Sequence, residues 1–306
     1  MAHDSFNTHV WLTMYEENQT PLPHRDGSVV FARELESLQR RGLATPAPPV
    51  TPETVVRFAD RARRPEVVSI CRRLLLPGSG LRGVEQLKEL ASLAERGKSC
   101  LLCLNHRSTL DVPTLCTLLE DHSDPSLFDR IIWISGRKLE EDVGMTSPLV
   151  QSVNRVVVTP NTWFASERSE KEQRQGRLVN LAAERAVAKL RDQGWVFALF
   201  PAGTRTRLDD PSTRKAIEQV HGYLDLFDYL LLGHIRGCTM PVSRDHDLSH
   251  ESPQLDKVVF SFGPVRRTKD WVGEAATRFP DLDSRAASAR ALTDEIERLG
   301  AEHSDD

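Results

Sequence analysis

Short apolar runs alternate with stretches of helical periodicity from residue 98 onward. The apolar runs predict buried strands at residues 100–104, 131–134, 156–158, 195–200, 230–232 and 258–262. Apolar residues at helical spacing predict helices between them, at residues 112–119, 178–190 and 217–227. Strands that alternate with helices are typical of an α/β protein. We therefore expect a central mixed sheet flanked by helices over residues 98–265.

The rest of the chain follows other patterns. Residues 1–52 contain repeated prolines and little periodicity, so we expect an irregular N-terminal segment there. Residues 53–97 have helical spacing and predict a helical lead-in, with one helical stretch that opens near Glu53 and continues after Pro65 to Leu74, and a second helix from Val84. Residues 266–306 predict a C-terminal helix and an acidic tail. The expected fold class is thus α/β with an N-terminal helical segment.

Composition and charge narrow the classes of function. Hydrophobic residues make up 39% of the 306 residues, which suffices for a buried core. The 40 Lys and Arg residues nearly balance the 44 Asp and Glu residues, so we expect no nucleic-acid partner. No run approaches the ~20 apolar residues of a membrane span, and the N-terminus lacks the pattern of a signal peptide. We therefore expect a cytoplasmic protein whose contact with a membrane, if any, is peripheral and on the inner face.

The segment with the most informative chemistry is NHRSTLD, residues 105–111. His106 follows a predicted strand directly, and Asp111 stands where a helix should begin. In a continuous helix, residues five apart point ~140° apart, but a strand–turn–helix junction reverses the chain and can bring them together. A carboxylate bonded to one imidazole nitrogen fixes the tautomer and raises the basicity of the other nitrogen. The pair is therefore a candidate general base for an alcohol.

A structural role is the alternative for the same two residues. Asp111 precedes Val112 and Pro113, as a helix N-cap residue often does. His106 could then be a polar residue at the end of a strand. The spacing alone leaves both interpretations open.

A second candidate loop, PAGTRTR at residues 201–207, follows the strand at 195–200. Its Pro and Gly turn the backbone away from the sheet, and Arg205 and Arg207 follow. Guanidinium groups bind phosphate oxygens bidentately, and α/β proteins place ligands at loops beyond strand ends. The alternative is a solvated basic turn paired with the nearby Asp209 and Asp210.

Together these segments resemble the glycerol-phosphate and lysophospholipid acyltransferase superfamily, whose HX4D signature is Asn-His-x4-Asp. Residues 105–111 match that block, residues 200–207 match a Phe-Pro-Glu-Gly-Thr-Arg block, and residues 240–242, Met-Pro-Val, match a short Pro-Val block. The blocks occur in the family's order. The resemblance covers about residues 80–265.

The resemblance implies fatty acyl transfer in phospholipid biosynthesis. The expected donor is an acyl thioester, either acyl-CoA or acyl carrier protein, and the expected acceptor is glycerol 3-phosphate or its 1-acyl form. His106 is expected to be the general base and Asp111 to orient it, whereas Gly203, Thr204 and the two arginines bind the acceptor phosphate. The thioester is then a co-substrate, and we expect no metal ion or other cofactor.

Two departures from the family pattern leave alternatives open. Ala202 replaces the usual Glu, as a small residue does in the soluble glycerol-3-phosphate acyltransferases, which the chain resembles most. A glycine–aliphatic–aromatic motif that leads to an arginine is matched only loosely at residues 154–160, so Lys138 and Arg155 are the candidates for its phosphate contact. The alternatives are a non-catalytic lipid- or phosphate-binding homologue and an acyltransferase for a non-lipid acceptor.

Two further patterns are expected to be structural. Residues 78–83 fit the Gly-x-Gly-x-x-Gly dinucleotide fingerprint, but they follow a predicted helix end rather than a strand. Cys100 and Cys103 form a Cys-x-x-Cys pair, yet within a strand their side chains point to opposite faces. The five scattered cysteines are therefore expected to be reduced core residues.

Overall fold

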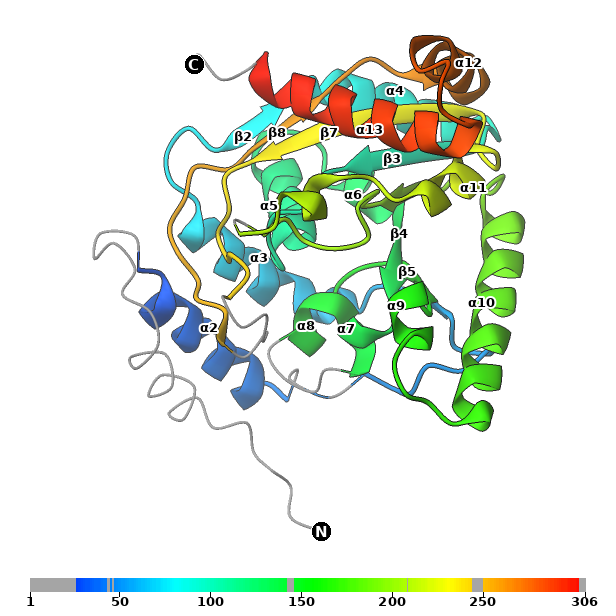
Figure 1. Ribbon diagram of the computed structural model, residues 1–306. Coiled ribbons are helices and arrows are strands. Elements are labelled where there is room, and N and C mark those ends of the chain that lie inside the picture. The colour runs from blue at the N-terminus through cyan, green and yellow to red at the C-terminus, as the bar shows by residue number, and fades with distance from the viewer. Residues whose placement is uncertain are drawn as a thin grey trace.

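A mixed sheet of nine strands runs through the described part of the molecule, in the order β1-β5-β4-β6-β3-β7-β8-β2, with β9 paired to β7 (Figure 1). The computed structural model describes residues 26–42, 45, 47–141, 146–207, 209–243 and 250–302. The strands are β1 (Val56–Arg57), β2 (Gly80–Arg82), β3 (Cys100–Leu104), β4 (Ile131–Gly136), β5 (Arg155–Val158), β6 (Val196–Leu199), β7 (Tyr229–Arg236), β8 (Val259–Phe262) and β9 (Arg266–Arg267).

The five central strands β5, β4, β6, β3 and β7 are parallel, so their carboxyl ends meet at one edge of the sheet. At the margins, β1, β8 and β9 run antiparallel to their neighbours, and β2 is parallel to β8. Loops that leave the parallel strands at their carboxyl ends are where α/β folds place ligands. The loops after β3 and β6 both leave at this edge.

Helices cover both faces of the sheet. They are α2 (Ser28–Arg40), α3 (Arg64–Leu74), α4 (Val84–Glu95), α5 (Asp111–His122), α6 (Ser126–Asp129), α7 (Lys138–Glu141), α8 (Thr146–Gln151), α9 (Asn161–Phe164), α10 (Glu170–Leu190), α11 (His221–Leu224), α12 (Thr268–Arg278) and α13 (Ser284–Ala301). The longest, α10, begins with a capping box in which Ser169 and Glu172 satisfy each other's backbone N–H groups.

Alternation along β3 separates two hydrophobic cores. Leu102 and Leu104 point to what we call the first face, which α4, α5 and α6 cover. Leu101 and Cys103 point to the second face, covered by α10, α11, α12 and α13. All of these side chains are buried, and each buried leucine contributes about 1.5–3 kcal/mol relative to exposure. In Figure 1, α13 runs along β7 on the second face.

The predicted fold class is confirmed: the chain is α/β, with a mixed sheet flanked by helices and with helical segments toward the N-terminus. The sheet takes in strands from β1 to β9, so it extends beyond both limits of the predicted 98–265 unit. Among the described residues, no helix is both long enough and apolar enough to cross a bilayer. Residues 1–25 and the tail at 303–306 lie outside the described residues.

In the helical stretch predicted from residue 53, the part after Pro65 is confirmed as α3, but the part before it is wrong. The segment instead forms β1 and a short 3-10 helix, Arg61–Arg63. The hydroxyl of Thr54 accepts from the Thr51 N–H (2.8 Å) and donates to a proline carbonyl (2.9 Å), which holds the turn before the strand. The carbonyl of Val55 then accepts from β5. Pairing with the exposed edge of β5 thus overrides a weak local helical pattern.

Two helices of more than ten residues were not predicted. The first is α2, inside the segment predicted to be irregular, where Phe31 and Leu38 pack into a cluster with Ile70 and Leu74 of α3. The second is α12, which precedes the expected C-terminal helix, observed as α13. Both are short, and their stability comes from the partner helix rather than from strong periodicity of their own.

A buried charge cluster ties α7 to the edge of the sheet and yields a prediction. The Glu140 carboxylate accepts from Arg57 of β1 (2.7 Å) and from both Nε and Nη2 of Arg155 of β5. We expect Glu140→Ala to lower the free energy of unfolding by about 3–5 kcal/mol, because two buried guanidinium groups lose their counter-ion. Urea unfolding measures this loss. Lys138→Ala, an exposed change in the same helix, is the control, and equal stability of the two variants would contradict the cluster's role.

Candidate active site

The end of β3 and the start of α5 bring His106 and Asp111 together, as predicted. The Asn105 side chain first extends the pairing with β7, accepting from the Ile235 N–H (2.6 Å) and donating to its carbonyl (3.0 Å). The chain then turns, and α5 begins at Asp111. His106 Nδ1 lies 2.8 Å from Asp111 Oδ2.

The same carboxylate oxygen organises the whole turn. Asp111 Oδ2 also accepts from the backbone N–H groups of Arg107 (2.6 Å) and Ser108 (3.0 Å). These donors precede Asp111, whereas an N-cap side chain accepts from residues that follow it. The helix-capping alternative is therefore wrong. Because a carboxylate only accepts, His106 Nδ1 must donate, which leaves the lone pair on Nε2.

Stacking fixes the plane of the imidazole. The His106 ring lies parallel to the ring of Phe200, with centroids 3.8 Å apart, and Phe200 stacks in turn on Trp133. The side chain of His106 is 17% exposed. Among the described residues, no hydrogen bond to Nε2 is made, so this atom is available to a substrate. The ring therefore has one face covered and one nitrogen committed to Asp111.

Burial lowers the pKa of His106 below its ordinary value, since desolvation disfavours the imidazolium. The hydrogen bond and charge of Asp111 oppose this shift, whereas the positive charge of Arg205 adds to it. The imidazole is thus neutral near neutral pH. A neutral imidazole with a free Nε2 is competent to accept a proton.

The loop after β6 lies against the His106 loop. The backbone N–H of Thr206 donates to the His106 carbonyl (2.8 Å), which joins the two loops directly. Gly203 has a φ of 64°, a left-handed conformation that L side chains rarely adopt. Thr204 is half-buried in the same turn. The two segments matched to family blocks therefore form one surface at the carboxyl edge of the sheet.

Arg205 is already paired within the protein. Its Nη1 donates to Thr109 Oγ1 (2.6 Å) and to Glu251 Oε2 (2.5 Å), and Thr109 donates to the same carboxylate oxygen (2.9 Å). The Glu251 side chain is fully buried. Glu251 and Thr109 were not predicted from the sequence, because neither stands in a recognisable spacing with Arg205. Ala202 in the same loop carries no carboxylate, and the carboxylate that reaches Arg205 comes from a distant segment.

Arg207 has different surroundings. Its backbone N–H donates to Thr213 Oγ1 (2.9 Å), which holds the loop against the next turn. In the part of the chain that the structure describes, its half-exposed guanidinium makes no ion pair or hydrogen bond. The two arginines therefore do not form one shared clamp, and Arg207 is the cation with its donors available.

Of the other two candidate phosphate contacts, Arg155 lies away from the carboxyl edge of the sheet and Lys138 lies near it. Arg155 is level with Trp133 in the middle of the sheet, and β5 is three strands from β3, a separation of about 14 Å. Its guanidinium is buried against Glu140. Arg155 therefore belongs to the structural cluster rather than to this site. Lys138 is exposed at the start of α7, two residues beyond the carboxyl end of β4.

The third block closes the site from the side of β7. Cys238 Sγ donates to the Arg107 carbonyl (3.2 Å), so the chain after β7 touches the His106 turn. Met240 is fully buried in a cluster with Leu110. Burial raises the pKa of the Cys238 thiol to about 12, so it remains protonated near neutral pH. It is thereby unsuited to act as a nucleophile.

The remaining sequence patterns have structural roles. Residues 80–82 of the glycine fingerprint are strand β2 itself, preceded by α3 rather than by a strand. Gly83 caps α4 with a φ of 67°, and a Cβ there would lie 2.4 Å from the Phe262 carbonyl oxygen. Cys100 and Cys103 belong to opposite cores, and all five cysteines are free. Among the described residues, no group of three or more His, Cys, Asp or Glu side chains could hold a metal ion.

Comparison with known proteins gives one finding. No curated protein matches the chain. A family model described as Acyltransferase matches residues 81–233, which are half of the 306 residues. The matched range contains both His106 with Asp111 and the loop that carries Arg205 and Arg207. This chain is therefore a member of the acyltransferase family, a family of transferases.

Proposed function

We propose that the chain transfers a fatty acyl group from an acyl thioester, acyl-CoA or acyl carrier protein, to a hydroxyl group of glycerol 3-phosphate or its 1-acyl form. The observation that carries this proposal is the 2.8 Å contact between His106 and Asp111, which leaves Nε2 available at the carboxyl edge of the sheet. Membership of the acyltransferase family supports the class of reaction.

His106 acts as the general base in this reaction. Nε2 takes the proton of the acceptor hydroxyl while the oxygen attacks the thioester carbonyl. The C–S bond then breaks, and the leaving thiolate takes the proton from the imidazolium, which Asp111 stabilises. Such proton transfer contributes about 10²–10⁴-fold to the rate, and holding the two substrates in position contributes further. The protonated state of the Cys238 thiol supports direct attack without an acyl-enzyme.

Arg207 binds the phosphate of the acceptor in this proposal. Its guanidinium is half-exposed on the loop that contacts the His106 turn. Charge-assisted hydrogen bonds from such a group to phosphate are among the stronger polar contacts in proteins. Gly203 and Thr204 line the same turn and offer a backbone and a hydroxyl group to the ligand. Arg205 acts on the site through its positive charge, which disfavours protonation of His106.

An acceptor without a phosphate is the second candidate, because Glu251 offsets the charge of Arg205. An acyltransferase for a non-lipid alcohol would need only the base and the acyl donor. The non-catalytic alternative has less support, since His106, Asp111 and the backbone donors of the turn are all in place. Cytoplasmic location and peripheral contact with a membrane remain predictions of the sequence.

Replacing the base tests the reaction. We expect His106→Ala to reduce acyl transfer by about 10²–10⁴-fold, measured as thiol release from acyl-CoA or acyl carrier protein with glycerol 3-phosphate or its 1-acyl form. His122→Ala, an exposed change at the end of α5, is the matched control and should retain activity. Retained turnover in His106→Ala would contradict the assignment, and turnover with unphosphorylated alcohols alone would favour the second candidate.

The two arginines should respond differently to substitution. Arg207→Ala should raise the KM for the phosphorylated acceptor by about tenfold or more, with the melting temperature and the KM for the acyl donor nearly unchanged. Arg205→Ala should lower the free energy of unfolding by about 3–5 kcal/mol, because the buried Glu251 carboxylate loses its cation. Steady-state kinetics and urea unfolding of both variants measure these effects. An unchanged acceptor KM in Arg207→Ala would refute the phosphate contact.

A further inference from the structure

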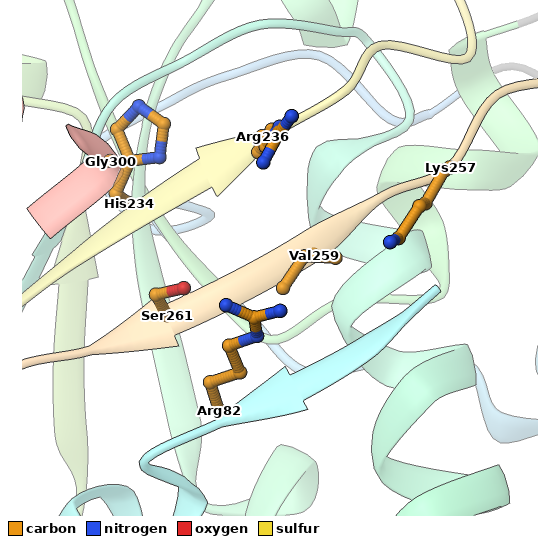
Figure 2. A pocket seen from close by; sticks show the side chains of 7 residues that line it. All are labelled: Arg82, His234, Arg236, Lys257, Val259, Ser261 and Gly300. Carbon is orange, nitrogen blue, oxygen red and sulfur yellow. The ribbon is translucent and has the colours of Figure 1, made fainter. Parts of the chain in front are cut away.

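A polar hollow lies away from the His106 site, where β2, β8 and β7 meet the C-terminal end of α13 (Figure 2). The residues that line it are Arg82, His234, Arg236, Lys257, Val259, Ser261 and Gly300. Three of them are cationic and one is a histidine, and none belongs to the loops around His106.

Strand register explains why these side chains converge. Val259 of β8 is paired with Arg236 of β7 on one side and with Gly80 of β2 on the other. Ser261, two residues on, is paired with Arg82 of β2. Residues two apart on a strand share a face, and directly paired residues lie about 5 Å apart. Val259 is therefore the floor of the hollow, and the arginines of the two flanking strands rise beside it.

The remaining walls come from the same face. Lys257 precedes Val259 by two residues, and His234 of β7 is paired with Ser261. Gly300 of α13 abuts the His234 ring, since an added Cβ would lie 2.6 Å from it. On the fourth side is Gly80, where an added Cβ would meet nothing within 4 Å. The hollow is thus open beside Gly80 and closed by the helix end.

This hollow is on the opposite side of the sheet from His106. His234 and Arg236 alternate with Ile235, which packs into the core of the first face, so they point to the second face. The His106 ring instead stacks on Phe200, which packs against the core of the first face. A ligand in the hollow would therefore not contact the proposed base.

We propose that this hollow binds a phosphate group of a ligand, independently of the acyl-transfer site. Arg82 and Arg236 stand on the two strands that flank β8, and Lys257 lies just before β8, so a bound dianion is attracted by all three cations. Two guanidinium groups and an ammonium line the hollow and supply charged donors, and the Ser261 hydroxyl adds a neutral one. Four of the lining residues also interact with other parts of the chain, and a bound phosphate replaces those interactions. They are Arg82, His234, Arg236 and Lys257. Both a lipid headgroup and a small phosphate ester carry the required group.

Gly80 offers a test that removes no cation. A side chain placed at position 80 would point to the same face as Arg82, and a Cβ there would meet open space. Because Gly80 does not adopt a left-handed φ, both Gly80→Ala and Gly80→Glu fit the backbone. The carboxylate of Gly80→Glu occupies the hollow in place of phosphate. Binding of inorganic phosphate is measured by calorimetry in an Arg207→Ala background, which removes the proposed contact at the other site.

We expect Gly80→Glu to weaken phosphate binding by about tenfold or more and Gly80→Ala to leave it nearly unchanged. Arg236→Ala, a change at an exposed side chain, should weaken it as well and serves as the second variant if Gly80→Glu unfolds. Absence of phosphate binding in the Arg207→Ala parent, or binding that neither Gly80→Glu nor Arg236→Ala weakens, would overturn the proposal.

Vesicles of phosphatidylcholine with and without phosphatidic acid distinguish the two sources of phosphate. Binding to the acidic vesicles that Gly80→Glu abolishes identifies a lipid headgroup as the ligand. If Gly80→Glu weakens the binding of inorganic phosphate and the protein does not bind the vesicles, the ligand is a small phosphate ester. Either pattern supports the hollow as a phosphate site.

Discussion

The candidate site depends on a single buried carboxylate oxygen. Asp111 Oδ2 accepts from the imidazole of His106 and from two backbone N–H groups, so one atom sets the turn, the ring orientation and the tautomer. Asp111 is only 4% exposed, and hydrogen bonds to a buried charged acceptor are stronger than those between neutral groups. Loss of the carboxylate would leave three donors without their acceptor and would free the imidazole to change tautomer.

The parallel sheet places the other parts of the site around this oxygen. The loops after β3 and β6 leave the sheet at the same edge, and the bond from the Thr206 N–H to the His106 carbonyl joins them. Phe200, at the end of β6, provides the surface on which the imidazole stacks. The imidazole, the ring that covers one of its faces and an available guanidinium thus come from two loops, and the proposed reaction needs them to be positioned before the substrates meet.

The parts of the fold and site that depend on residues close together in the sequence could be predicted from hydrophobic patterns and motif spacing. The strand, turn and helix around His106 follow from an apolar run and a short turn, so the meeting with Asp111 could be expected from spacing. The Glu251 carboxylate could not, because it reaches Arg205 from 46 residues away and depends on the path of the chain after β7. The same holds for β1, whose two residues are strand only because the edge of β5 is open to them. The motif made Arg155 a candidate for a phosphate contact, but its position in the middle of the sheet places its guanidinium in an ion pair with Glu140.

The tautomer and titration of His106 test the central claim most directly. Nitrogen-15 NMR of the labelled imidazole across a pH series reports which ring nitrogen carries the proton and the pH at which the second is bound. We expect a proton on Nδ1 and a bare Nε2 in the neutral form, with a pKa below 6.5 because burial disfavours the charged ring. Below that pKa the ring gains its second proton and can no longer act as a base. A proton on Nε2 in the neutral form, or a pKa above 6.5, would contradict it.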